Sequence, residues 1–249
     1  MINNKSEYIK MDSVENSHWW YKSLHHMVLN IIKNEFNSSN ISILDAGCGT
    51  GGLLSSLTAN GYNFLHGFDI SKEAIDIAKS KNLKVSISDL KQYKYTDQAY
   101  DIIISNDTMY FLTLDEQKKI LNEFYKSLNL NGIVILNLPS FDTFRGMHDE
   151  AVGIKKRFNK KMVHAMIKNS KYKVIKQTYW PFSLSPIIFF IRMLQRFKLI
   201  FLKNSKIKSD IDLPSDVINN ILYKVVSFEN KFLVKKPFGS SLFLVLQKK

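Results

Sequence analysis

The 249-residue sequence contains a single cysteine, Cys48, which excludes a disulfide within the chain. It contains no apolar run of 18 residues, which argues against a transmembrane helix. Residues 1–10 lack the apolar core of a signal peptide. Internal repeats, low-complexity tracts and Pro/Gly-rich linkers are also absent. These absences predict a single cytoplasmic domain in a reducing compartment.

Acidic residues are scarce in the second part of the chain. Residues 1–150 hold 14 Lys and Arg against 18 Asp and Glu, a net charge of −4. Residues 151–249 hold 21 against 4, a net charge of +17, and the whole chain carries +13. This asymmetry favours an anionic partner such as a phosphate, a nucleic acid or a lipid surface. A lysine-rich surface that meets only water is the alternative interpretation.

Short apolar runs alternate with helical patterns along the chain. The runs predict strands at 41–44, 64–68, 84–87, 100–105, 133–138, 173–178 and 242–247. Helical patterns lie at 18–33, 53–59, 71–79 and 116–128. Strands that alternate with helices predict an α/β fold, with a doubly wound, mostly parallel sheet of seven strands and helices on both faces.

The first predicted strand runs directly into a glycine-rich turn. Residues 44–52 read LDAGCGTGG, with glycines at alternate positions. A backbone without Cβ atoms can turn tightly and lets a ligand lie against it. A strand, a glycine turn and a helix, in that order, form the context of a nucleotide-binding loop.

The next two predicted strands end at acidic residues. Asp69 lies about 20 residues beyond the glycines, the position from which a carboxylate binds two ribose hydroxyls. Ile70 is then placed to pack on an adenine ring, and Asp89 to accept a hydrogen bond from the adenine amino group. Each acid taken alone is equally well explained as a helix N-cap or a solvated carboxylate. Three acids at successive strand ends, with Asp45 the first, favour a nucleotide-like ligand.

Over residues 41–138 these motifs resemble class I S-adenosylmethionine-dependent methyltransferases. The pattern GxGxG, rather than GxGxxG, favours that methyl donor over a nicotinamide dinucleotide. The resemblance implies a Rossmann-like sheet with an antiparallel last strand, and it places Asp45 and Gly47 near the methionine part of the cofactor. Cys48 occupies a position that is commonly a small residue in the family, so we expect it to pack rather than to react. The predicted cofactor-binding residues are Asp45, Ala46, Gly47, Cys48, Gly49, Gly51, Asp69, Ile70, Ser88, Asp89, Leu90 and Asn106.

After the fourth strand, residues 106–112 (NDTMYFL) resemble a family segment that often reads D-x-L-E-H-L. Phe111 occupies the place of the usual histidine, so a base at that position is absent. Asp107 is a candidate catalytic residue of this segment, and Tyr110 is a candidate for contact with the methyl acceptor.

A second candidate base follows the fifth strand. His148-Asp149 lies eight residues before Arg157-Phe158, and this resembles an H-D…R-R-Y stretch of related methyltransferases. A histidine titrates near neutral pH, so His148 suits removal of a proton from a hydroxyl acceptor. His148 and Arg157 are therefore predicted to contact the acceptor. A polar loop histidine without a catalytic role is the alternative.

The N-terminal helix carries Glu15-x-x-His18-Trp19-Trp20-Tyr21. It resembles an acid-x-x-H-W-W/F helix of bacterial methyltransferases from glycan and natural-product clusters, which lies over the cofactor cleft. Two adjacent tryptophans are not expected to face one core, so we predict that the residues from His18 to Tyr21 contact the acceptor as a lid. A core helix with aromatic anchors is the alternative.

The segment 179–203 combines an apolar run at 187–191 with Arg192, Gln195, Arg196 and Lys203 at helical spacing. An apolar helix with a basic stripe is typical of helices that lie on an anionic membrane. We favour a helix that covers the sheet and the acceptor pocket with its basic edge in water, and keep membrane contact through 187–203 as the alternative. Residues 237–242 (PFGSSL) resemble the P-F-G-x-S-L ending of the same relatives.

The sequence therefore predicts one methyltransferase domain over 1–249, with N-terminal lid helices (1–40), a cofactor-binding core (41–140) and an acceptor-side region with a helical insertion (141–249). The predicted reaction moves a methyl group from S-adenosyl-L-methionine, which becomes S-adenosyl-L-homocysteine, to an oxygen or nitrogen of a small molecule. A sugar or lipid-linked glycan intermediate, or another bacterial metabolite, is the expected acceptor, and an anionic one would suit the basic region. The enzyme is expected in the cytoplasm, with the inner face of the membrane as a peripheral site.

Two other functions remain as alternatives. The charge of +13 would suit a nucleic-acid methyltransferase. However, residues 106–109 (NDTM) replace the N/D-P-P-Y/F motif of base-amino methylases, and no RNA-binding module is appended, so nucleic acid is disfavoured. The other alternative is a non-catalytic partner protein that keeps the fold and binds the cofactor. The six histidines and the single cysteine show no metal-ligand spacing, so no metal is expected.

Overall fold

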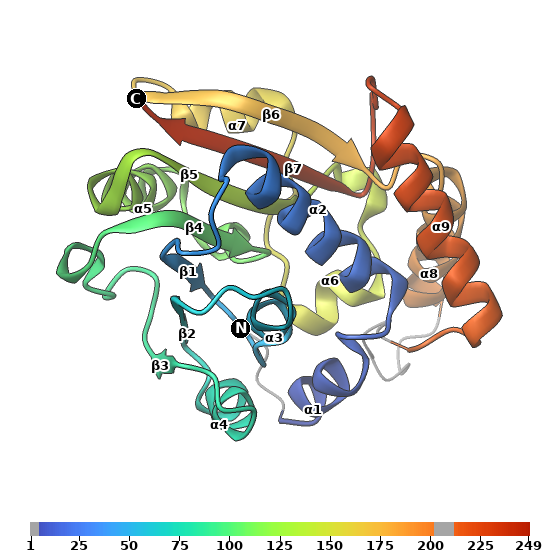
Figure 1. Cartoon of the computed structure of the whole chain (residues 1–249). Coiled ribbons are helices and arrows are strands. Elements are labelled where there is room, and N and C mark those ends of the chain that lie inside the picture. Colours follow the sequence, from blue (N-terminus) through green and yellow to red (C-terminus); the bar gives the residue numbers. More distant parts are fainter. Residues whose placement is uncertain (1–4, 202–211) are drawn as a thin grey trace.

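The computed structural model describes residues 5–201 and 212–249. Its centre is a seven-stranded sheet in the order β3-β2-β1-β4-β5-β7-β6 (Figure 1). The strands are β1 (Ile43–Ala46), β2 (Leu65–Asp69), β3 (Val85–Ile87), β4 (Tyr100–Asn106), β5 (Leu128–Pro139), β6 (Tyr172–Trp180) and β7 (Ser241–Lys248). β7 pairs antiparallel with β5 and β6, and the remaining pairs are parallel. The predicted fold, with its antiparallel seventh strand, is confirmed.

Helices cover both faces of the sheet. They are α1 (Lys5–Val14), α2 (Trp19–Glu35), α3 (Gly52–Ala59), α4 (Lys72–Ser80), α5 (Leu114–Ser127), α6 (Met147–Val152), α7 (Lys160–Ile167), α8 (Ser185–Phe201) and α9 (Asp216–Phe232). Single 3₁₀ turns occur at Tyr95–Asp97, Met109–Phe111 and Asp142–Phe144. Helices α2, α3 and α9 contribute side chains to the hydrophobic cluster on one face, and α5 and α7 to the cluster on the other.

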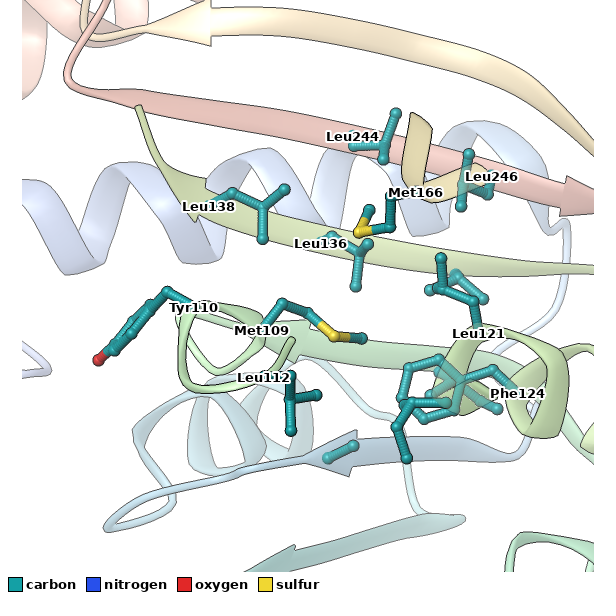
Figure 2. Close-up of a cluster of buried hydrophobic side chains, with 14 of the residues drawn as sticks. Met109, Tyr110, Leu112, Leu121, Phe124, Leu136, Leu138, Met166, Leu244 and Leu246 are labelled. Atoms are coloured by element: carbon teal, nitrogen blue, oxygen red, sulfur yellow. The ribbon is translucent and has the colours of Figure 1, made fainter. Parts of the chain in front are cut away.

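Two-residue periodicity in the strands divides the apolar side chains between these clusters. Ile102 and Ile104 belong to the cluster under α2, whereas Ile103 belongs to the one under α5. Because helices cover both faces of the sheet, the sequence of β4 contains a continuous apolar run. Figure 2 shows the α5 side, where Tyr110 lies at the edge of the cluster with its hydroxyl pointing away from it.

Helix α2 corrects one expectation about the adjacent tryptophans. Trp19 and Trp20 both pack against the hydrophobic cluster on the α2 side of the sheet. The ring of Trp20 stacks on the buried Trp180 at the end of β6, with 5.3 Å between centroids. Successive helical residues point only about 100° apart. Two half-buried rings in a first turn can therefore flank one cluster, and the premise that they cannot share a core was wrong.

The chain after β5 also differs from expectation. His148 lies in helix α6 rather than in a loop. The helix expected at 187–203 is α8, and its expected residues beyond 201 lie outside the described part of the chain. Arg192 and Arg196 of the expected basic edge are half-buried, whereas Ile187, Phe190, Ile191, Leu194 and Phe197 are exposed. Within the described residues, no helix has both the length and the apolarity to cross a bilayer.

Candidate functional site

A cavity of about 800 Å³ opens at the carboxyl ends of β1, β2, β4 and β5. β2 and β4 lie on opposite sides of β1, so the chain order reverses at this point of the sheet. In doubly wound sheets, ligands bind in the crevice beyond such a reversal. The strand order of the sheet therefore determines where the cavity lies.

Most of the predicted site residues line this one cavity. Those predicted to bind the cofactor are Asp45, Gly47, Cys48, Gly49, Asp69, Ile70, Ser88, Asp89, Leu90 and Asn106. Those predicted for catalysis or the acceptor are His18, Trp19, Trp20, Tyr21, Asp107, Tyr110, His148 and Arg157. Segments that are far apart in sequence thus meet in one space, while the role of each residue stays a prediction.

Ala46 and Gly51 are the exceptions, because neither lines the cavity. Ala46 is fully buried in β1, where its carbonyl oxygen accepts a hydrogen bond from Ser105 at 2.9 Å. Gly51 caps α3 with φ +85°, and a Cβ there would collide with Leu83. Both residues support the glycine loop from behind, and their contact with a ligand stays a prediction.

Backbone contacts hold the glycine loop against the end of β2. The amides of Gly47 and Cys48 donate to the carbonyl oxygen of Phe68 at 2.8 and 2.9 Å. The amide of Gly49 donates to the Asp69 carboxylate at 3.0 Å. Gly47 has φ +90°, and a Cβ on it would collide with the methyl group of Thr108. The loop therefore needs glycine at position 47 for two reasons, its backbone angle and the close approach of the segment after β4.

Gly47→Ala should destabilise the fold more than Gly61→Ala does. Gly61 has nearly the same backbone angle, φ +87°, but no atom lies within 4 Å of a Cβ placed there. Gly61→Ala therefore measures the backbone strain alone, about 1–3 kcal/mol. Gly47→Ala should add the collision, and Thr108→Ser in that background should recover the added part. Urea unfolding measures all three, and equal losses for the two glycine variants would refute the collision.

The loop brings three carboxylates together at one side of the cavity. Asp45 is only 3% exposed at the end of β1. Burial, followed by the charges of Asp69 and Glu15, raises the pKa of Asp45 to about 8. The ionised form of such a carboxyl is favoured by a nearby positive charge. Asn106 adds a buried side-chain oxygen that has no hydrogen-bond partner among the described residues, and it also lines the cavity. This side suits a ligand with cationic and hydrogen-bond-donor groups.

Helix α1 forms a wall of the cavity that the residue predictions missed. Tyr8 and Met11 of α1 line the cavity together with Glu15 just beyond it. The ammonium group of Lys81 holds this segment to the glycine loop, at 2.7 Å from the Glu15 carboxylate and 2.9 Å from the carbonyl oxygen of Thr50. Positions 8, 11 and 15 are spaced as on one face of a helix. This spacing is the signal in the sequence from which the wall could have been predicted.

On the opposite side, Asp107 is held by a hydrogen-bond chain. The Asn137 amide donates to Asp107 at 2.8 Å, and the Trp180 indole donates to the Asn137 side-chain oxygen at 2.9 Å. Burial raises the pKa of Asp107 to about 7. Because the indole has only a donor, it fixes the amide so that its NH₂ faces Asp107. Asn137 was not predicted, since its importance depends on two distant partners.

Arg157 lies in the cavity wall but is occupied by other parts of the chain. Its guanidinium forms two hydrogen bonds with Asp149, of 2.6 and 3.0 Å, and donates to the carbonyl oxygens of Ser140 and Ser240 at 3.0 and 3.4 Å. These contacts use four of its five N–H groups. Arg157 therefore joins the segments that follow β5 and precede β7, and its contact with an acceptor stays a prediction.

Two further side chains have defined protonation states. Burial lowers the pKa of His18 to about 4, and its Nδ1 accepts a hydrogen bond from the Trp20 amide at 3.2 Å. His18 is thus neutral with its proton on Nε2, a hydrogen-bond donor. Cys48 packs with Leu54 and Ile75, and burial holds the pKa of its thiol well above the usual range. Cys48 is packed, as expected, and its raised pKa favours the protonated thiol.

Comparison with known proteins identifies the family. The model of a family described as a methyltransferase domain matches residues 37–189. This is more than half of the chain, which therefore belongs to that methyltransferase family. Carboxy-S-adenosyl-L-methionine synthase of Staphylococcus epidermidis is 30% identical over 131 residues, 50% of this chain and 56% of the relative. Malonyl-[acyl-carrier protein] O-methyltransferase of Bacillus cereus is 29% identical over 135 residues, 51% and 48%. The chain thus matches about half the length of these curated relatives.

Solved structures support the same fold. The plantazolicin methyltransferase BpumL, in complex with SAH, aligns with a TM-score of 0.62 at 15% identity, over 98% of this chain and 88% of that protein. A putative sarcosine dimethylglycine methyltransferase from Galdieria sulphuraria aligns with a TM-score of 0.60 at 13% identity, over 91% and 85%. At such low identity the likeness concerns the fold alone.

Proposed function

We propose that this chain binds S-adenosyl-L-methionine and transfers its methyl group to an oxygen or nitrogen atom of a small molecule. The observation that carries the proposal is that one cavity is lined both by the glycine loop with its acidic residues and by aromatic residues with Asp107 and His148. One space thus offers a place for a donor beside a place for an acceptor. The name of one relative, carboxy-S-adenosyl-L-methionine synthase, and the SAH bound to BpumL support this cofactor.

The residues present fit the cofactor. Asp69 lies at the end of β2 for the ribose hydroxyls, and Asp89 beyond β3 for the adenine. Asp45, whose buried carboxyl needs a positive partner, suits the ammonium and sulfonium charges of the methionine part. When bound, S-adenosylmethionine supplies a methyl group on a sulfonium that is already activated for displacement. The tasks left to the chain are to hold the acceptor in line and to exclude water.

The acceptor side supports a hydroxyl-bearing acceptor. A hydroxyl needs a base as it reacts, and a base is most effective when its pKa lies near the working pH. Asp107, with a pKa of about 7, meets this condition, and His148 lines the same cavity. His18 adds an Nε2 proton that can hold an acceptor oxygen. We infer that a sugar or a lipid-linked glycan intermediate is the acceptor, and a smaller bacterial metabolite is the second candidate.

Calorimetric titration of S-adenosylmethionine and S-adenosylhomocysteine tests the cofactor. We expect both to bind the wild type and Asp69→Ala to weaken binding at least about tenfold, because hydrogen bonds to a charged carboxylate contribute about 1.5–3 kcal/mol. Asp76→Ala removes an exposed acid of α4 outside the cavity and is the matched control. Wild-type protein that binds neither compound, or equal affinities in the two variants, would overturn the proposal.

The acceptor is then sought with the same protein. Release of S-adenosylhomocysteine is measured in the presence of nucleotide sugars, free sugars and lipid-linked sugars. Stimulation by a hydroxyl-bearing member of this set supports the proposed acceptor class. Stimulation by RNA or DNA alone, with steep salt dependence, would replace it with the nucleic-acid alternative.

A further inference from the structure

Helix α8 turns its apolar side away from the protein. Ile187, Phe190, Ile191, Leu194 and Phe197 are 47–59% exposed. They recur at i, i+3, i+4, i+7 and i+10, so they form one continuous stripe on the helix. A surface helix of a water-soluble protein normally buries such a stripe against the core.

Arg192 and Gln195 of α8 instead face the protein. The side-chain oxygen of Gln195 accepts hydrogen bonds from the Met147 amide of α6 at 3.2 Å and from Arg192 at 2.9 Å. Arg192 lies across Gly146, where a Cβ would collide with it. Both polar residues also line the cavity. These polar contacts hold the helix with its apolar stripe outward.

Helix α9 lies at the same end of the molecule as α8 (Figure 1). It also carries exposed apolar side chains. The side chains of Phe228 and Phe232 are 62% and 56% exposed, with 4.7 Å between ring centroids. The ammonium group of Lys231 lies 5.1 Å from the ring of Phe232. The buried Glu229 carboxylate connects this helix to the start of α8, because it accepts hydrogen bonds from the amides of Phe182 and Ser183 at 2.8 and 2.7 Å.

We propose that the outward stripe of α8 and the exposed side of α9 rest on the surface of an anionic lipid bilayer. Charge complementarity favours this partner, because residues 151–249 carry a net charge of +17. Lys224, Lys231 and Lys235 are exposed on or just after α9, beside its aromatic residues. Aromatic and aliphatic side chains with lysines among them are typical of helices that lie in the membrane interface, and basic residues are attracted to anionic leaflets.

The position of the stripe links the membrane to the cavity. Ile191 belongs to the outward stripe and also lines the cavity, and its neighbour Ile188 does so as well. The rim of the cavity at α8 thus borders the apolar surface. A lipid-linked acceptor would place its polar head in the cavity while its chain stays in the bilayer. This last step rests on the proposed function, whereas binding to the membrane does not.

Vesicle flotation of the full chain tests the membrane contact directly. The probes are phosphatidylcholine vesicles with and without roughly 30% phosphatidylglycerol. This anionic lipid gives the vesicle the negative surface charge of an anionic leaflet. We expect binding to the anionic vesicles, and a loss of at least about tenfold in Phe190→Glu/Leu194→Glu. Phe64→Glu/Leu130→Glu is the matched control, because these residues have the same types, are 56% and 75% exposed, and lie outside α8, α9 and the cavity. This control should bind like the wild type.

Three results would overturn the proposal. They are wild-type protein that does not float with anionic vesicles, an α8 variant that floats as well as the control, and a wild-type dimer that dissociates in the α8 variant without any vesicle binding. The last would assign the stripe to a second copy of the chain. Circular dichroism and S-adenosylhomocysteine calorimetry accompany each variant, so that loss of the fold or failure of the proposed cofactor is separated from loss of membrane binding.

Discussion

Arg157→Met is expected to lower the free energy of unfolding by about 3–5 kcal/mol, the usual effect of removing one partner from a buried ion pair. The side chains of Arg157 and Asp149 are 5% and 0% exposed. Without the guanidinium, Asp149 would remain in a buried place with an uncompensated charge, and the carbonyl groups of Ser140 and Ser240 would lose a donor. Denaturant unfolding followed by circular dichroism measures the loss.

A second variant separates the charge from the packing. Asp149→Leu in the Arg157→Met background should recover most of the stability, because no unpaired charge then remains. Lys126→Met is the control for an exposed pair, since Lys126 and Glu123 are 2.8 Å apart but 53% and 29% exposed. It should change stability by less than about 1 kcal/mol. Equal losses in Arg157→Met and Lys126→Met would contradict the assigned role.

The same pair should make the wild type sensitive to acid. Burial raises the pKa of Asp149, but the hydrogen bonds and charge of Arg157 outweigh it and leave that pKa below its usual range. A lowered carboxyl pKa adds stability that is present above the unfolded value, about 4, and is lost as the pH falls through the folded value. The wild type should therefore lose more stability below about pH 4 than the double variant does.

Asp107→Asn is expected to lower kcat by about 10²–10⁴-fold with a hydroxyl acceptor, the usual contribution of a positioned base. Asn137 can still donate to the new side chain, so the local structure should be kept. A base with a pKa of about 7 is active when deprotonated, so the wild-type rate should rise with pH through that value. This rise should be absent in the variant. Release of S-adenosylhomocysteine at saturating cofactor measures both effects.

His148→Gln is the matched comparison, because His148 lines the same cavity. Cofactor affinity should be unchanged in both variants, which separates a loss of turnover from a loss of binding. If only His148→Gln lost activity, the base would be His148, as the sequence first suggested. Full activity in both variants would contradict base catalysis and favour an amine acceptor that arrives neutral.

The sequence predicted the sheet because its strands follow a simple physical pattern. Runs such as Ile102-Ile103-Ile104 are apolar on both faces, and this occurs where helices cover both faces of a parallel sheet. Glycines lie directly after the first strand, and acids lie at the ends of the next strands. This pattern predicted one side of the cavity. Residues identified this way depend on backbone position alone, and the ends of parallel strands always meet at one edge.

The other side of the cavity depended on contacts between distant segments. The local sequence pattern does not predict that Asn137 forms hydrogen bonds with Asp107 and Trp180. It also does not predict that the guanidinium of Arg157 is occupied by Asp149. The packing of the adjacent tryptophans and the outward apolar stripe of α8 were not anticipated for a related reason. Helical periodicity identifies an apolar stripe but does not say which way it faces.

The sequence by itself determined the positions of the strands along the chain, the glycine loop and the acids at the ends of β1 and β2. Only the tertiary structure decided that Tyr8 and Met11 of α1 line the cavity, that the pKa of Asp107 is raised to about 7, and that α8 exposes its apolar stripe. The physical reason is the distance along the chain over which each interaction acts. Strand and turn preferences act between neighbouring residues, whereas burial, pKa and orientation are set by side chains that meet only after the chain has folded.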